Sequence, residues 1–318
     1  MNFLLAILLL LPFQHPNERT TLTSVFAVDA NFAVASGETG LIARTLDGGK
    51  TWRYTHNAGK TQNDLYSICF TDKKSGWAVG KSGTILTTLD GGNNWKNSDS
   101  SSSHDLMCVR FVNPQIGWIA GSRGLILKTT DGGKQWVRQY SNVTLDLWSA
   151  SFIDPQTGWV TGAHGTIIKT TDGGETWLPT QSKMQNFMLG ISFIDKDHGW
   201  VSGGYGAVLN TTNGGKVWFE QNTLDNMQFF KTNNFHYGIN FANAQTGWVV
   251  GSTGVIMKTT DGGGNWDTQE SNTTDVLRGV SALNEKVVWV VGGNGSILKT
   301  ADGGKSWTIQ SSVKNDGK

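Results

Sequence analysis

An eight-residue motif, Thr-x-Asp-Gly-Gly-x-x-Trp, occurs seven times in this chain of 318 residues, once with Asn in place of Asp. Its third position is occupied by Asp47, Asp90, Asp131, Asp172, Asn213, Asp261 and Asp302. Neighbouring members of this set are 43, 41, 41, 41, 48 and 41 residues apart. A repeat of about 40 to 45 residues is typical of propeller blades. The motif therefore restricts nearly the whole chain to seven copies of one structural unit.

Each repeat contains four short stretches that are typical of β-strands and are bounded by Gly, Ser, Asp or Asn. In the second repeat these stretches are Leu65–Phe70, Gly76–Val79, Thr84–Thr88 and Asn94–Asn97. The eight-residue motif falls between the third and the fourth stretch, and no segment has the periodicity of a helix. The sequence predicts an all-β fold, a seven-bladed β-propeller of four-stranded antiparallel blades with one motif turn in each blade.

The phase of the repeat predicts how the ring closes. The first repeat begins with an innermost strand, Leu22–Val28, and the last repeat ends with an outermost strand, Trp307–Gln310. Blades one and seven are therefore expected to pack against each other without sharing a strand. Small residues recur at one place of the innermost strands, where the blades converge, and we interpret them as packing residues. They are Ser24, Ser67, Cys108, Ser149, Gly190, Gly238 and Gly279.

The chain opens with an apolar run of 11 residues, Phe3–Phe13, which is too short to cross a bilayer. We interpret residues 1–16 as a secretory signal peptide and residues 17–318 as the propeller, which places the protein in the periplasm or outside the cell. A hydrophobic N-terminal strand is the alternative interpretation. In an exported protein Cys69 and Cys108 could form a disulfide, and two buried free thiols are equally compatible with the sequence.

Charge and composition exclude several classes of function. The formal net charge is +1, only 16% of the residues are charged, and no block of like charge occurs, so a nucleic-acid partner is not expected. No apolar run is long enough for a membrane span. The six histidines lack the spacing of zinc ligands, and the sequence predicts neither a metal site nor a cofactor.

The motif turns are predicted to be structural. The Asp side chain can accept backbone N–H groups across the turn, the Gly-Gly pair permits positive φ, and the Trp can pack between blades. Asn213 fits this interpretation, because an amide oxygen accepts the same hydrogen bonds whereas a catalytic acid could not be replaced in this way.

The motif resembles the Asp-box, also known as the bacterial neuraminidase repeat. Together with the preceding Gly-Trp-x-x-Gly element it is most similar to the photosystem II stability and assembly factor family. The resemblance implies a non-catalytic, extracytoplasmic scaffold that binds another protein, and we expect a monomer. An arginine-rich patch is associated with function in photosynthetic members. In this chain the arginines are scattered over different strand positions, at Arg44, Arg53, Arg110, Arg123, Arg138 and Arg278.

A carbohydrate-binding or glycoside-hydrolysing propeller, similar to the sialidases, is the alternative function. The chain lacks the Phe/Tyr-Arg-Ile-Pro element of sialidases, and no catalytic residue is predicted. The only carboxylates expected near the axis open the innermost strands, together with two amides in similar places. These residues are Asp64, Asp105, Asp146, Asp275, Asn186 and Asn234. They could bind a cation or sugar hydroxyls, but we expect them to cap the turns that lead into their strands.

Six residues are predicted to bind the partner, either an acidic protein surface or a glycan. Lys81, Arg123, His164 and Tyr205 lie in successive turns between second and third strands and would form an arc on one face. Phe229 and Phe230 lie in the segment Asn222–Asn234, which contains the extra residues of the longest repeat. Loops on a rigid scaffold commonly carry binding residues, and aromatic side chains commonly anchor interfaces. Two alternatives remain: the identity of the turn residues is unconstrained and has no role in binding, or the phenylalanines fold back over the channel.

Overall fold

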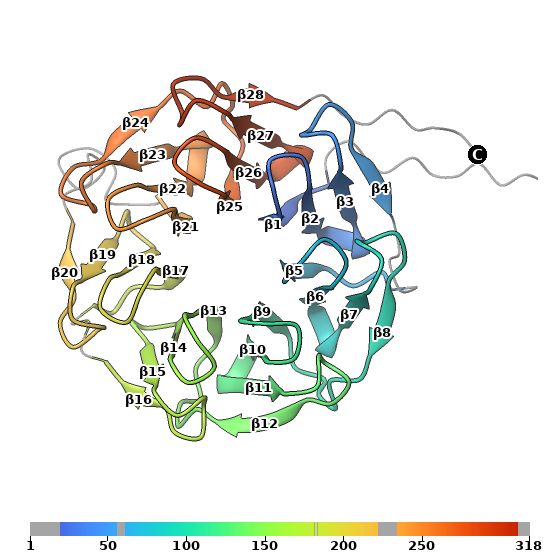
Figure 1. Ribbon diagram of the computed structural model, residues 1–318. Coiled ribbons are helices and arrows are strands. Elements are labelled where there is room, and N and C mark those ends of the chain that lie inside the picture. The colour runs from blue at the N-terminus through green and yellow to red at the C-terminus, as the bar shows by residue number, and fades with distance from the viewer. Residues whose placement is uncertain (1–19, 56–60, 181, 183, 222–233, 311–318) are drawn as a thin grey trace, which may run out of the picture.

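The computed structural model describes residues 20–55, 61–180, 182, 184–221 and 234–310. They form seven four-stranded antiparallel sheets around a central axis, and Figure 1 looks along this axis. The five short 3-10 turns are single-turn elements, and the described residues contain no α-helix. The prediction of a seven-bladed all-β propeller is confirmed.

Each blade uses four consecutive strands. The innermost strands are β1 (Leu22–Ala27), β5 (Leu65–Phe70), β9 (Leu106–Phe111), β13 (Leu147–Phe152), β17 (Met188–Phe193), β21 (His236–Phe241) and β25 (Leu277–Ala282). The second strands are β2 (Ala33–Gly37), β6 (Gly76–Gly80), β10 (Gly117–Gly121), β14 (Gly158–Gly162), β18 (Gly199–Gly203), β22 (Gly247–Gly251) and β26 (Val288–Gly292). The third strands are β3 (Ile42–Thr45), β7 (Ile85–Thr88), β11 (Leu125–Thr129), β15 (Ile167–Thr170), β19 (Val208–Thr211), β23 (Ile256–Thr259) and β27 (Ile297–Thr300). The outermost strands are β4 (Arg53–Thr55), β8 (Lys96–Ser98), β12 (Val137–Tyr140), β16 (Leu178–Pro179), β20 (Phe219–Glu220), β24 (Asp267–Gln269) and β28 (Thr308–Ile309).

The seven motif turns share one hydrogen-bond pattern. In the third blade the Thr129 hydroxyl donates to Asp131 Oδ1 (2.8 Å) and accepts the backbone N–H of Gly133 (2.9 Å). Asp131 Oδ1 also accepts the backbone N–H of Gln135 (3.0 Å). Both glycines of this turn have positive φ. In the fifth blade the Asn213 amide oxygen accepts the corresponding hydroxyl, at 3.0 Å.

Aromatic side chains fill the space between blades. The ring of Trp77 on β6 stacks on Phe111 of the next blade, with centroids 3.6 Å apart, and Phe111 meets Trp136 edge to face. Trp77 Nε1 also donates to the carbonyl of Gly132 in the next motif turn, at 3.0 Å. Because both contacts of Trp77 join its blade to the next one, the core is a ring of interblade clusters.

The seam between the first and last blades uses the same interactions as the other seams. β1 lies beside β25, and no strand is shared between them (Figure 1). The Ser281 hydroxyl accepts the backbone N–H of Ala27 (3.0 Å), and Ser151 accepts that of Phe193 in the same way (3.0 Å). Lys299 Nζ donates to the carbonyl of Gly48, at 2.7 Å. The expectation that blades one and seven pack against each other without sharing a strand is confirmed.

Some of the remaining predictions fall outside the described residues, and the structure decides others. The proposed signal peptide at residues 1–16, Phe229 and Phe230 lie outside the described residues. Cys69 and Cys108 are buried free thiols, so of the two alternatives the unpaired one holds. Within the described residues no helix is long and apolar enough to traverse a bilayer.

Candidate functional site

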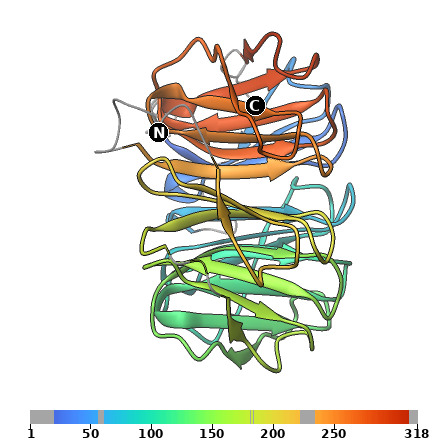
Figure 2. The ribbon, with the colours of Figure 1, turned by 90° about the vertical axis from the view of Figure 1, so that its left-hand side faces the viewer.

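The turns between second and third strands place one residue per blade at an exposed tip. All seven tip residues have left-handed φ between 51 and 58°. They are Thr39, Ser82, Arg123, His164, Tyr205, Thr253 and Asn294. We call the side of the ring that carries these tips the upper face; Figure 2 shows the ring from its side. Arg123, His164 and Tyr205 occupy equivalent positions, whereas Lys81 precedes the tip residue Ser82, and all four side chains are exposed.

Carboxylates from the link into each of blades two, three and four hold the tip of the preceding blade. Asp105 Oδ1 accepts the backbone N–H of Ser82 (2.8 Å), and Asp146 Oδ1 accepts that of Arg123 (2.9 Å). Asp64 Oδ1 accepts the N–H of Thr39 at 2.9 Å. The prediction that these carboxylates cap the turns leading into their own strands is therefore wrong. They bond the neighbouring blade, because its tip directs a backbone N–H at them.

Blades five and six carry phenylalanine where blades two to four carry aspartate. The carbonyls of Phe187 and Phe235 accept the N–H groups of Gly204 (2.9 Å) and Ser252 (3.0 Å), just as the Asp64 carbonyl accepts that of Lys81 (2.9 Å). Asn186 and Asn234 lie one residue earlier, so their expected equivalence with the aspartates is wrong by one residue.

In blade seven the predicted residue is also displaced by one position from that of the aspartates in blades two to four. The Val276 carbonyl accepts the N–H of Gly293 at 2.8 Å and so occupies the aspartate position. Asp275 lies one residue earlier and accepts hydrogen bonds from Asn294 and Ser296 of its own blade.

This replacement creates a chain of aromatic rings across blades four to six. Phe187 lies against His164, the tip of the preceding blade, with centroids 6.4 Å apart, and Phe235 lies against the tip residue Tyr205 at 6.0 Å. Phe187 and Phe235 are 6.4 Å apart. Trp148 meets Phe187 at 5.5 Å, and Tyr237 stacks on Phe235 at 5.8 Å. We call these six side chains, which are Trp148, His164, Phe187, Tyr205, Phe235 and Tyr237, the aromatic arc.

The aromatic arc is accessible from solvent. Phe187 is 37% exposed and Tyr205 is 48% exposed, although both side chains are large and partly apolar. The structure thus brings together two of the predicted binding residues, His164 and Tyr205. Lys81 and Arg123 lie in the corresponding turns of blades two and three, on the same face.

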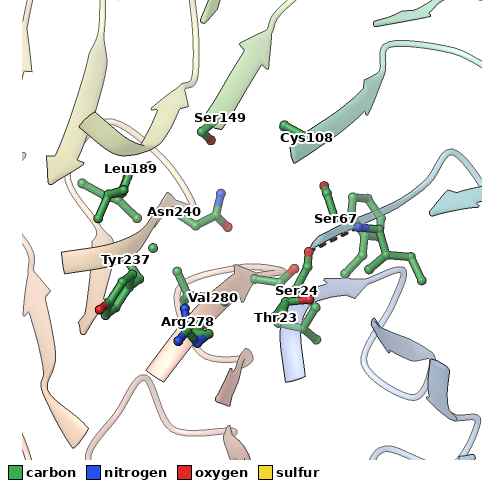
Figure 3. Close-up of a pocket in the computed structure, with 18 of the residues that line it drawn as sticks. Thr23, Ser24, Ser67, Cys108, Ser149, Leu189, Tyr237, Asn240, Arg278 and Val280 are labelled. Atoms are coloured by element: carbon green, nitrogen blue, oxygen red, sulfur yellow. Dashed lines mark hydrogen bonds between the residues drawn. The ribbon is translucent and has the colours of Figure 1, made fainter. Parts of the chain in front are cut away.

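The arc continues into the central channel through a repeated backbone irregularity. Each innermost strand has a register shift around its second residue, and such bulges redirect a side chain. The seven side chains at this position line the channel. They are Thr23, Tyr66, Met107, Trp148, Leu189, Tyr237 and Arg278. The cavity has a volume of about 420 Å³, and Figure 3 shows part of its wall.

The small residues of the innermost strands also line this cavity. A Cβ atom on Gly190 would lie 2.7 Å from Ser202 Oγ, and one on Gly279 would lie 3.1 Å from Ser24 Cα. The side-chain size at this position is therefore limited by neighbouring backbone and side chains, as the packing interpretation requires.

The composition of the cavity wall bears on the carbohydrate alternative. The cavity wall contains no Asp or Glu among the described residues, whereas glycoside hydrolysis generally uses a pair of carboxyl groups. Within the same residues no group of three or more His, Cys, Asp or Glu could hold a metal ion. The cavity wall offers aromatic rings and polar side chains that can bind a ligand by stacking and by hydrogen bonds.

Sequence reasoning missed Trp148, Phe187, Phe235 and Tyr237. One signal was present, since Trp148 is the only tryptophan outside the two repeated positions. The phenylalanines gave no comparable signal, because the links into the innermost strands differ in length and carry no motif.

The family model for the photosynthesis system II assembly factor YCF48 matches residues 54–147 and 178–274, more than half of the chain. The chain belongs to the YCF48 family. This agrees with the resemblance of its repeat unit. No curated protein matches the chain.

Solved structures share the propeller fold. A structure entitled "YCF48 bound to D1 peptide" is 17% identical with a TM-score of 0.74, and the match covers 91% of this chain and 94% of that one. YCF48 from Cyanidioschyzon merolae is 19% identical with a TM-score of 0.71, covering 90% and 96%. The GH74 xyloglucanase from Xanthomonas campestris is 12% identical with a TM-score of 0.74, covering 92% of this chain but 55% of the enzyme.

Proposed function

We propose that this YCF48-family propeller is a non-catalytic scaffold that binds another protein through the aromatic arc on its upper face. The observation that carries the proposal is the continuous contact of six rings, three of them more than a third exposed, on a rigid array of blades. Aromatic side chains are enriched at the energetic centres of protein interfaces. One solved relative is described as bound to a D1 peptide, which supports a polypeptide partner.

The predicted residues outside the arc extend this proposal. Lys81 and Arg123 are exposed on blades two and three of the same face and add positive charge that suits an acidic partner. Phe229 and Phe230 stay a prediction from sequence. We also propose that the protein acts outside the cytoplasm as a monomer, on the basis of the apolar run at Phe3–Phe13 and the closed ring. Cell fractionation and light scattering test these two points.

The test of the binding proposal replaces two tips inside the arc and two tips outside it. In the His164→Gly/Tyr205→Gly variant both rings are removed at positions with left-handed φ, which glycine adopts without strain. Thr253→Gly/Asn294→Gly makes the same backbone change on blades six and seven and serves as the control.

We expect the arc variant to lose its partner in pull-downs from the native extracytoplasmic fraction, at unchanged melting temperature, while the control retains it. Equal recovery of the partner by both variants would reject the arc as the binding surface.

A carbohydrate ligand is the second candidate, because sugar rings also stack on exposed aromatic side chains. The likeness to the GH74 enzyme concerns the fold, and the described channel wall lacks a pair of carboxylates. Calorimetric titration with soluble oligosaccharides distinguishes this candidate: binding that depends on Tyr205 would favour it over a protein partner.

A further inference from the structure

The wall of the central channel carries two arginine side chains, while the carboxylates Asp64 and Asp105 act electrostatically on another lining residue, Tyr66. Arg110 on β9 and Arg278 on β25 both line the cavity, and its described lining contains no Asp or Glu. Neither guanidinium forms an ion pair with a described carboxylate. A cleft lined by charge of one sign concentrates ions of the opposite sign. The channel is thus electrostatically suited to an anion.

Arg278 presents its charge beside aromatic surface. It occupies the bulge position of β25, and its Cζ lies 5.1 Å from the centroid of the Tyr237 ring (Figure 3). Tyr237 in turn stacks on Phe235. Contact with a ring face stabilises the cation but uses none of its five N–H donors, and no hydrogen bond joins these donors to the part of the chain that the structure describes. A planar, bidentate acceptor such as a carboxylate suits them.

Arg110 supplies a second set of donors deeper in the channel. It is the fifth residue of β9, three residues beyond the bulge position, which corresponds to roughly 10 Å along the strand. Its Nη1 donates to the Val109 carbonyl (2.8 Å) and to Ser67 Oγ (3.3 Å), and these bonds hold the side chain in place. The Nε and Nη2 groups have no hydrogen-bond partner among the described residues.

We propose that the channel binds a carboxylate joined to an aromatic or apolar group. Arg278 would take the carboxylate, and Trp148, Leu189 and Tyr237 would contact the apolar part; Figure 3 shows Leu189, Tyr237 and Arg278 around the same space. The cavity volume of about 420 Å³ lies within the usual range of small-ligand sites.

The carboxylate belongs either to a small free acid or to the carboxyl terminus of a polypeptide, which present the same chemistry. The inference does not depend on the proposed protein-binding function of the aromatic arc.

Calorimetry of the full chain with matched probes tests the proposal. The first pair is 3-phenylpropionate and its neutral amide, and the second pair is one phenylalanine-terminated peptide with a free or an amidated carboxyl terminus. The variants are R278Q, which removes the guanidinium beside the Tyr237 ring, and R138Q, an exposed charge change on the outermost strand β12.

We expect an acid to bind the unaltered chain at least tenfold more tightly than its amide. We expect this preference to disappear in R278Q, to persist in R138Q, and to weaken with added salt. If both acids bind more tightly than their amides, a small free acid is sufficient for binding. If only the peptide acid does so, the carboxylate belongs to a polypeptide terminus. Equal binding of acid and amide, or an undiminished preference in folded R278Q, would overturn the proposal.

Discussion

At the scale of single residues, the motif turns show that the side chain at the third motif position can accept the turn hydrogen bond whether or not it is ionisable. Asn213 Oδ1 accepts the backbone N–H of Val217 at 3.0 Å, as Asp261 Oδ1 accepts that of Asn265 at 2.9 Å. The backbone and side-chain N–H groups of Asn265 lower the pKa of Asp261 to about 2. The amide makes the same Oδ1 acceptor bond without a proton to gain, but it has no second oxygen to accept the bond that Asp261 Oδ2 receives from Asn265 Nδ2 (2.7 Å).

Asp261→Asn should therefore make the propeller less sensitive to acid. The folded pKa of about 2 lies below the unfolded value of about 3.9, so the stabilisation is present above pH 4 or so and is lost as the pH falls towards 2. Urea unfolding at several pH values measures this. We expect a smaller loss of unfolding free energy between neutral and acidic pH in the variant, and an identical loss would contradict the assignment.

The tryptophan of the motif should matter more for stability than the acid. Trp136 is 9% exposed and meets Phe111 edge to face, so Trp136→Ala should cost about 3 to 5 kcal/mol through the cavity it leaves. Asp131→Ala loses turn hydrogen bonds at the surface and should cost less. Denaturant unfolding gives both values. Because both residues are structural, partner recovery per folded molecule should not change; selective loss of binding would make the turn functional.

At the scale of strands and links, equivalent side chains join consecutive blades. Ser151, Ser192, Asn240 and Ser281 occupy the same position of their innermost strands and accept a backbone N–H from the following blade. Only the Ser281 bond crosses from the last blade to the first. The closing seam is thus built from the same pairwise contacts as the internal seams.

Ser281→Ala and Ser151→Ala should destabilise the protein equally, by about 1 kcal/mol each, because each removes one partly buried interblade hydrogen bond. Thermal and denaturant unfolding of the two variants provide the comparison. A much larger effect of Ser281→Ala would mean that the closing seam is the weak point of the ring.

The links also explain which parts of the site the sequence could not predict. The repeated motif fixes the third and fourth strands of every blade, and the fold follows from its spacing. The links into the innermost strands have no motif, so the sequence alone aligns Asn186 and Asn234 with the aspartates of the other links. In the structure Phe187 and Phe235 occupy the aspartate position. Contacts such as Tyr205 with Phe235 join two blades, and local periodicity does not encode them.

At the scale of the whole molecule, the upper face is divided into two chemically different parts. On blades one to three, carboxylates bond the backbone of the tips, whereas on blades four and five phenylalanine rings contact the tip side chains. The repeat supplies seven equivalent positions, and the substitution of one residue type at two of them creates a directional surface. A partner bound there has a defined orientation relative to the ring.

Each blade is formed from one continuous segment of the chain, and this affects how the protein can fold during synthesis. Every blade obtains its four strands from one uninterrupted stretch of chain, and the closing seam exchanges no strand. Each sheet can therefore be completed as soon as its own segment leaves the ribosome, in the order of synthesis. Only the contacts between blades one and seven, such as those of β1 with β25 and of Lys299 with Gly48, must wait for the last blade. A chain of this kind can be assembled progressively, without holding an unpaired strand until the end.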